Sequence, residues 1–184
     1  WAQASVVDKV QSMGALRYVF FPLAIAAAVA AAHAHAATLH VGAASCDITP
    51  DMPSFLHGSF SARVSTGVQY PLTASVLALE SREGDKPLDS AIIISVDTCV
   101  VRASFLLPLR EAVRQQLPQF DLGKLIVAAT HTHTAPTTLD GSFKQQDHVQ
   151  VPSDYVRSAV AKIAAAARQA WDGRKPASFS FGLG

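Results

Sequence analysis

Two histidines one residue apart, His131 and His133, are the side chains of this chain whose types and spacing could do chemistry. They lie in the stretch AATHTHTAP, residues 128–136, directly after an apolar run. In an extended chain, side chains two residues apart point to the same side, so both imidazoles can face one pocket. Neutral imidazole binds zinc through one nitrogen, while its other N–H needs a carboxylate or carbonyl partner. The pair therefore indicates a metal site; the alternative is a polar loop whose threonine hydroxyls bond the backbone.

A zinc site needs three or four ligands, so the pair needs partners from elsewhere. Asp97 ends another apolar run, and its carboxylate is a candidate to bond and orient a ligating imidazole. His57 lies in a predicted loop and His148 in an irregular stretch, so neither is assigned as a ligand. The remaining ligands are not evident in the sequence.

The segments around these residues predict a sheet. A charged turn with Gly84, residues 81–87, indicates a hairpin between two strands. The β-branched run SAIIISVD, residues 90–97, is typical of a strand covered on both faces. The predicted strands are residues 39–45, 72–80, 90–97 and 125–130.

Residues 104–117 lie between the last two of these strands and have helical spacing, with Ser104 as the expected N-cap. A strand–helix–strand unit makes a crossover between parallel strands, whose carboxyl ends form a crevice. This unit brings Asp97 and the histidine loop to the same edge of the sheet. The apolar face of the helix carries Leu106, Leu109, Val113 and Leu117.

A second helix is predicted at residues 154–171, capped by Ser153 and ended by Gly173. The alternating residues 177–182 predict a final strand. The fold class is therefore α/β, with a mixed sheet, a βαβ unit and covering helices. Because the last strand has no closing element, we expect residues 37–184 to be the incomplete N-terminal part of a larger domain. The apolar stripe of the second helix consists of Val156, Val160, Ile163, Ala167 and Trp171.

The first 36 residues have the order of an export signal. Arg17 precedes an apolar run, and Ala34-His35-Ala36 is a fitting cleavage triplet, so residues 13–36 predict a signal peptide. The alternative is an uncleaved anchor. Residues 1–12 precede Met13 and are expected to be an upstream extension that is not native. The mature protein is expected to be secreted or periplasmic.

Composition and motifs exclude several function classes. The net charge is +1 and no basic patch is visible, so nucleic-acid binding has no support. Motifs for nucleotide binding and for the serine esterase elbow are missing. The two cysteines, Cys46 and Cys99, are either buried thiols or a disulfide, and the sequence leaves both readings open.

Four stretches together resemble the neutral/alkaline non-lysosomal ceramidases, in their N-terminal domain. They are VGAASCDITP (41–50), FLHGSF (55–60), IIISVDTCVV (92–101) and AATHTHTAP (128–136). The last is similar to the family's "THTHSGP", with Thr134-Ala135 in place of Ser-Gly. The order and spacing of all four fit the family.

This resemblance implies zinc-dependent hydrolysis of the amide bond of ceramide, a lipid substrate, to sphingosine and a fatty acid. It implies that His131 is a zinc ligand and that His133 lies in the active centre, where it orients substrate or stabilises charge. The family's other ligands are a later His, Glu and Tyr, and its essential Ser is also later. In some members a backbone carbonyl near the position of Leu56 holds a structural cation. Peripheral contact with membranes is a further expectation.

Two other functions stay open from the residues alone. One is a metal-dependent hydrolase of another amide or an ester on the same domain. The other is a non-catalytic exported binding domain with a structural histidine pair.

Overall fold

The computed structural model describes residues 37–182 of the chain. The predicted upstream extension, residues 1–12, and the predicted signal peptide, residues 13–36, lie outside the described residues. Among the residues described, no helix is long and apolar enough to span a bilayer.

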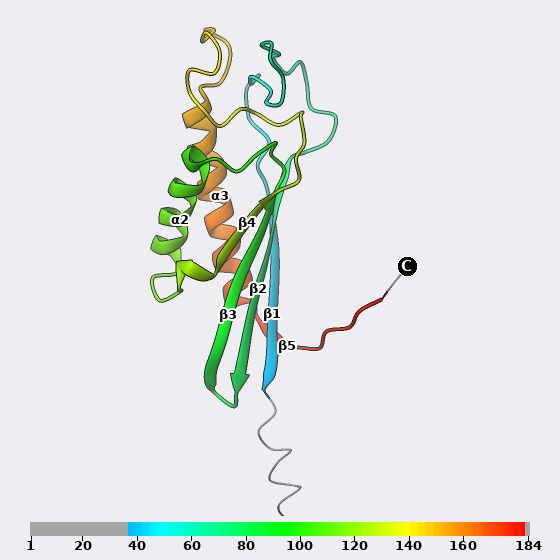
Figure 1. Ribbon diagram of the computed structural model, residues 1–184, viewed down its shortest axis with the longest axis vertical. Coiled ribbons are helices and arrows are strands. Elements are labelled where there is room, and N and C mark those ends of the chain that lie inside the picture. Colours follow the sequence, from blue (N-terminus) through cyan, green and yellow to red (C-terminus); the bar gives the residue numbers. More distant parts are fainter. Residues whose placement is uncertain (1–36, 183–184) are drawn as a thin grey trace, which may run out of the picture. The chain divides into compact units, whose positions relative to one another are not determined.

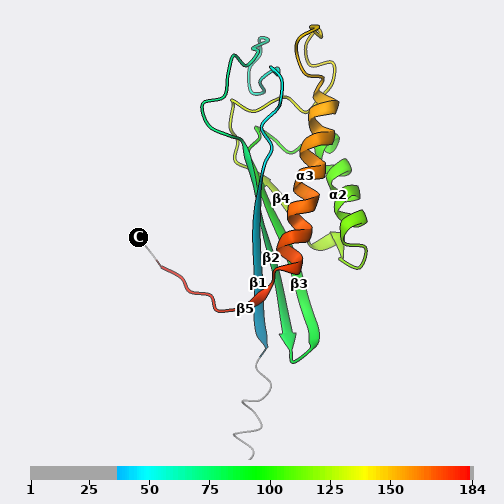
Figure 2. The same cartoon turned by 180° about the vertical axis from the view of Figure 1, so that it is seen from behind.

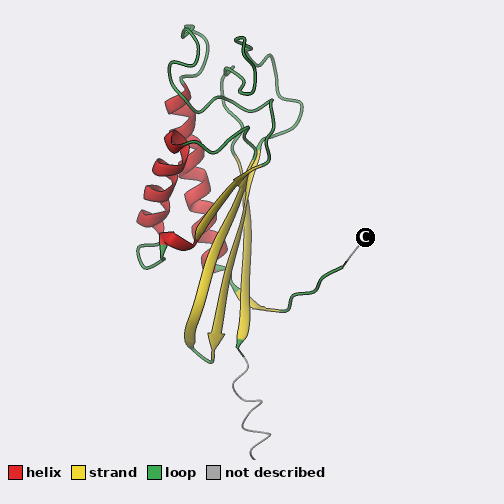
Figure 3. Cartoon of the chain, in the orientation of Figure 1, coloured by secondary structure: helices red, strands yellow, loops and turns green. Residues whose placement is uncertain are grey.

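A mixed five-stranded sheet organises the chain, in the order β4-β3-β2-β1-β5 (Figures 1 and 3). Neighbouring strands run antiparallel except β3 and β4, which are parallel, with Ile94 opposite Val127. The prediction of a mixed sheet is thus confirmed. The strands are β1 (Thr38–Asp47), β2 (Thr73–Glu83), β3 (Lys86–Val96), β4 (Leu125–Ala129) and β5 (Lys175–Ala177).

The hairpin and the βαβ unit also form as expected. Gly84 adopts a φ of 60° in the turn between β2 and β3, a left-handed conformation that glycine adopts without steric cost. Helix α2 (Ala103–Gln116) and the short 3-10 turn η1 (Leu122–Lys124) connect β3 to its parallel neighbour β4. The second long helix is α3 (Pro152–Asp172).

Both helices pack on the same face of the sheet (Figures 1 and 2). Ile92, Ile94 and Val96 of β3 are fully buried beneath them, whereas Ser95 is exposed and Ile93 is half-buried. The prediction that β3 is covered on both faces is therefore wrong for the part of the chain described. The reason is that a run of three isoleucines conceals the alternation that the pleat of a strand imposes.

The predicted helix starts need correction. The N-cap of α2 is Arg102 and that of α3 is Val151, and neither gives a side-chain cap hydrogen bond, so Ser104 and Ser153 do not cap. In α3, Pro152 occupies the first helical position, where its fixed φ suits the helix and its missing N–H has no partner to lose. Gly173 ends α3 as predicted.

The predicted final strand is shifted. Strand β5 covers Lys175–Ala177 rather than residues 177–182, because its pairing with Leu39–Val41 of β1 decides its position. The alternation in residues 177–182 therefore did not predict a strand correctly. Phe179 and Phe181 meet edge to face outside the sheet, with ring centroids 4.7 Å apart.

A buried ion cluster joins the segment directly after α3 to the sheet. Glu80 of β2 is 5% exposed and bonds Arg82 at 2.6 Å and Arg174 at 3.1 Å. The Arg174 guanidinium lies 3.5 Å above the Trp171 ring. Burial alone would raise the pKa of the Glu80 carboxyl, but the hydrogen bonds and charges of Arg82 and Arg174 outweigh it and hold this pKa below its usual value.

Replacing Glu80 with glutamine is expected to destabilise the protein by about 2 kcal/mol at neutral pH, because two partly buried guanidinium groups lose their counter-charge. A lowered folded-state pKa means that the carboxylate stabilises the fold above its unfolded pKa of about 4.3 and loses this effect as pH falls below it. Urea unfolding of both proteins at pH 7 and pH 3 should therefore show a difference at pH 7 that shrinks at pH 3. An equal difference at both pH values would contradict this role.

Candidate metal centre

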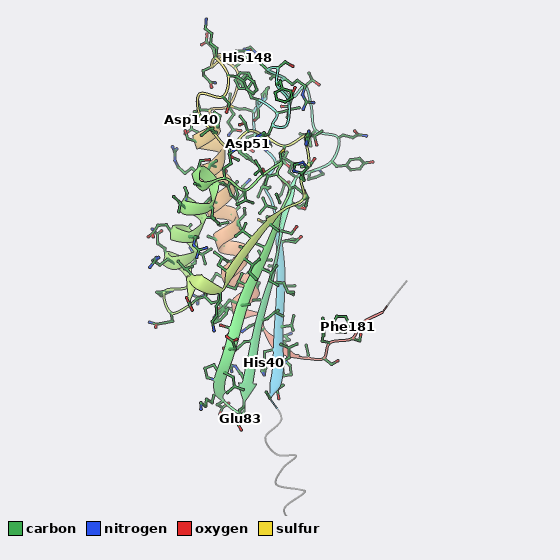
Figure 4. The ribbon with its side chains drawn as sticks, viewed as in Figure 1. His40, Asp51, Glu83, Asp140, His148 and Phe181 are labelled. Atoms are coloured by element: carbon green, nitrogen blue, oxygen red, sulfur yellow. The ribbon has the colours of Figure 1, made fainter. Side chains whose placement is uncertain are left out.

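The candidate centre lies at the end of the sheet where β3 and β4 stop and the long loops gather (Figure 1). Figure 4 places His148, Asp51 and Asp140 at this loop end, and His40 and Glu83 at the opposite end. The parallel pairing of β3 and β4 continues into the loops, where the His131 N–H donates to the Thr98 carbonyl at 3.0 Å. As predicted, one edge of the sheet carries both strand ends.

His131 has an uncommon backbone conformation, with a φ of 64°. Non-glycine residues rarely occupy this left-handed region, which costs roughly 1–2 kcal/mol, and such residues cluster at functional sites. This conformation occurs directly after β4, and the rings of His131 and His133 converge there. Their rings meet edge to face with centroids 5.0 Å apart.

The nitrogen atoms of the pair are arranged for metal binding. The Nδ1 of His131 lies 2.7 Å from the carbonyl oxygen of Cys99. Because a carbonyl oxygen only accepts hydrogen bonds, Nδ1 must carry a proton. In the neutral ring, the lone pair of Nε2 is then available to a metal. The Nε2 of His133 lies 3.4 Å from this Nε2. Two nitrogen ligands about 2.0–2.1 Å from a tetrahedral zinc ion lie roughly 3.3–3.4 Å apart. The geometry suits a shared cation, and both imidazoles are exposed to solvent.

The thiol of Cys99 is a third donor that sequence reasoning did not assign to the centre. Its Sγ and one nitrogen of each histidine lie within 4.8 Å of one another. Cys99 is 6% exposed. Cys99 and Cys46 are both free thiols, so they do not form a disulfide with each other. The signal in the sequence was its place two residues after Asp97, in the loop that follows β3. Nitrogen and sulfur donors of this kind are those that zinc prefers.

Asp97 lies at the same sheet edge but bonds elsewhere. Its Oδ2 accepts from the Thr73 backbone N–H at 2.8 Å and from the Thr73 hydroxyl at 3.0 Å. The hydrogen-bond partner of His131, expected from this carboxylate, is the carbonyl of Cys99. Within residues 37–182, Asp97 thus joins the start of β2 to the end of β3 and makes no hydrogen bond to either imidazole.

The loop between β1 and β2 brings His57 and Leu56 beside the histidine loop. Leu56 forms an isolated bridge with Pro136, and the His57 N–H donates to the Ala135 carbonyl at 2.9 Å. The Nδ1 of His57 is buried, and it has no hydrogen-bond partner among residues 37–182. Burial, followed by the charges of Arg102 and His133, lowers the pKa of His57, so its ring is neutral at neutral pH.

A cavity of about 680 Å³ lies beside the histidine loop. Thr132, Thr134 and Asp97 line it, together with Met52, Val68 and Tyr70 from the loop between β1 and β2. Alternate residues of the loop thus face opposite ways, with threonines toward the cavity and imidazoles toward Cys99. The cavity combines hydroxyl and carboxylate groups with an apolar wall.

Comparisons with known proteins bear on the fold. No protein-family model and no curated protein sequence matches the chain. Solved structures do match, among them neutral ceramidase from Pseudomonas aeruginosa, with a TM-score of 0.63, and a ceramidase complexed with C2, with a TM-score of 0.58. Each is 16% identical over 77% of this chain, and the chain spans only 22% of the length of either. The chain is therefore similar in fold to one part of the neutral ceramidases.

Proposed function

We propose that this protein is a zinc-dependent hydrolase that cleaves the amide bond of ceramide or a closely related N-acyl lipid. The observation that carries the proposal is the convergence of the His131 and His133 Nε2 atoms, 3.4 Å apart, in a fold similar to part of the neutral ceramidases. At 16% identity this similarity supports the fold, while the motif and its geometry support the chemistry.

The residues present fit a zinc ion. His131 would hold it through Nε2, with Nδ1 fixed as a donor by the Cys99 carbonyl; this arrangement selects the tautomer and orients the ring. The Cys99 thiol and His133 supply further donors at the same point. The resemblance to the ceramidases implies additional ligands, a His, a Glu and a Tyr, from a later part of the polypeptide.

A zinc ion in such a site polarises a carbonyl oxygen and lowers the pKa of water to about 7. The chain's own residues would place the substrate. The resemblance also implies a second role for His133: where later ligands complete the coordination of zinc, its imidazole would donate to an oxygen that develops negative charge. The cavity beyond Thr132 and Thr134 offers hydroxyl groups to the polar head of a lipid and an apolar wall to a chain.

The proposal includes a cellular setting, which the order of residues 13–36 supports. A signal peptide at residues 13–36 would deliver the protein to the periplasm or the exterior. A lipid amide substrate implies contact with a membrane or micelle surface during turnover.

The test uses the full-length protein loaded with zinc and a short-chain N-acylsphingosine, with release of sphingosine as the measurement. We expect hydrolysis that a chelator abolishes and added zinc restores. A matched ester and an N-acyl amino acid serve as parallel substrates. Cleavage of these but not of the N-acylsphingosine would indicate a different metal-dependent hydrolase, and zinc binding without any cleavage would indicate a binding domain.

A further inference from the structure

We propose that the segment Phe55–Val64 is a clamp that positions His133, with Arg63 as a positioning residue and Gly58 as the surface against which the ring rests. The inference deepens the proposed function and rests on it for the role of His133. The loop between β1 and β2 thereby takes part in the centre by positioning His133.

Backbone hydrogen bonds join this clamp to the residues that follow His133. The Leu56 N–H donates to the Arg63 carbonyl at 2.8 Å, which closes the clamp on itself beside the bridge between Phe55 and Val64. On the other side of the same segment, the His57 N–H donates to the Ala135 carbonyl oxygen, and the Thr137 N–H donates to the Phe55 carbonyl oxygen at 2.8 Å. The clamp and the segment 135–137 thus form a small hydrogen-bonded ladder of three paired segments.

The clamp has a rigid base. Phe55 is 2% exposed, Ala135 is fully buried, and the Phe55 ring lies against Phe143 with centroids 5.2 Å apart. The chain is therefore fixed on both sides of the histidine pair, by β4 before it and by the clamp after it. Short loops held at both ends by packed structure keep site geometry within the narrow limits that catalysis requires.

Arg63 bonds the clamp to His133 directly. Its Nη2 donates to the His133 carbonyl oxygen at 2.9 Å and to the His57 carbonyl oxygen at 3.3 Å. A charged donor shared between two carbonyls makes stronger hydrogen bonds than a neutral one would. Because the carbonyl of His133 is held, the backbone from which its imidazole extends is also held.

Gly58 sets the position of the ring. A Cβ atom built on Gly58 would lie 2.4 Å from Nδ1 and 2.5 Å from Cγ of His133, much closer than atoms in contact can approach. The φ of Gly58 is 81°, a second reason why only glycine suits this position. The ring therefore rests on the bare backbone of Gly58, with Nε2 directed toward His131.

The first experiment compares wild-type full-length protein with Arg63→Met, Arg63→Lys and a matched control, Arg157→Met, which removes an arginine that pairs with Asp154 on the exposed surface of α3. Cobalt(II) titration followed by visible absorption measures metal affinity. We expect Arg63→Met to weaken cobalt binding about tenfold, Arg63→Lys to restore part of the loss, and Arg157→Met to bind as the wild type does. Equal affinity of Arg63→Met and wild type would overturn the clamp.

A second measurement separates the clamp from the proposed function. Hydrogen exchange of the His57 and Thr137 amides in metal-free protein should be at least about fivefold faster in Arg63→Met than in the wild type, because those amides form the ladder. If the wild type binds no metal, the proposed function fails and exchange alone decides the clamp. Unchanged exchange rates would then refute it.

Gly58→Ala provides an independent variant. We expect it to displace the His133 ring and lower cobalt affinity more than Arg63→Met does, with the far-ultraviolet circular dichroism of the folded protein retained. An affinity equal to that of the wild type would contradict the contact between Gly58 and the ring. If Gly58→Ala does not fold, the arginine variants still decide the proposal.

Discussion

Replacing His131 with alanine or with glycine is expected to lower zinc affinity by more than about a hundredfold and to abolish hydrolysis, because each change removes the Nε2 donor whose geometry best fits a ligand. Competition with a chromophoric chelator measures the affinity. The product assay of the wild type provides the activity reference. Zinc binding by both variants at wild-type strength would refute the ligand assignment.

The same two variants are expected to differ from each other in stability, although both lose zinc. The φ of His131 is 64°, a conformation that suits glycine and strains alanine. In metal-free protein, His131→Gly should therefore be more stable than His131→Ala by about 1 kcal/mol, a difference of roughly 3 °C in Tm. Thermal unfolding followed by circular dichroism measures it. A lower Tm for the glycine variant would show that this backbone strain is not present in solution.

Replacing Gly42 with alanine is expected to destabilise the fold by at least about 3 kcal/mol. A Cβ atom on Gly42 would lie 1.9 Å from the carbonyl oxygen of Ala170, which belongs to the backbone of α3 and cannot swing aside as a side chain can. The helix would have to move away from β1, and the packing of its buried face on the sheet would loosen.

Gly67→Ala is the matched control, since no atom lies within 4 Å of the position that its Cβ would take. We expect a change of no more than about 0.5–1 kcal/mol, which can be stabilising because alanine restricts the unfolded chain. Urea unfolding of both variants gives the comparison. Equal stability of Gly42→Ala and Gly67→Ala would contradict the close packing of α3 on β1.

Local patterns predicted most of the regular structure. The charged turn with Gly84 identified the hairpin, and the spacing of Leu109 and Val113 identified the buried face of α2. Patterns of this kind are reliable because the pleat of a strand and the turn of a helix impose their own periods on buried residues. The errors arose where pairing or packing overrides them, as at β5, whose limits depend on β1 rather than on its own alternation.

The candidate site was predicted only in part. The pair of histidines and their place after β4 were visible in the sequence, and so was the approach of the Asp97 strand. The sequence predicts for Cys99 either a buried thiol or a disulfide, because its neighbours along the chain do not show where a single cysteine points. Thr73 could not be foreseen as the partner of Asp97, because a hydrogen bond between residues 24 positions apart depends on the pairing of β2 with β3.

By itself, the sequence determined the α/β class, the order of the main strands and helices, and the histidine pair, because each of these depends on residue types and spacings within one segment. Only the tertiary structure decided which groups meet that pair. The Cys99 carbonyl reaches His131 across 32 residues, and Arg63 reaches His133 across 70. Such contacts depend on how whole segments pack against one another. This packing decides which donor atoms meet at the centre and which segment holds His133 in place.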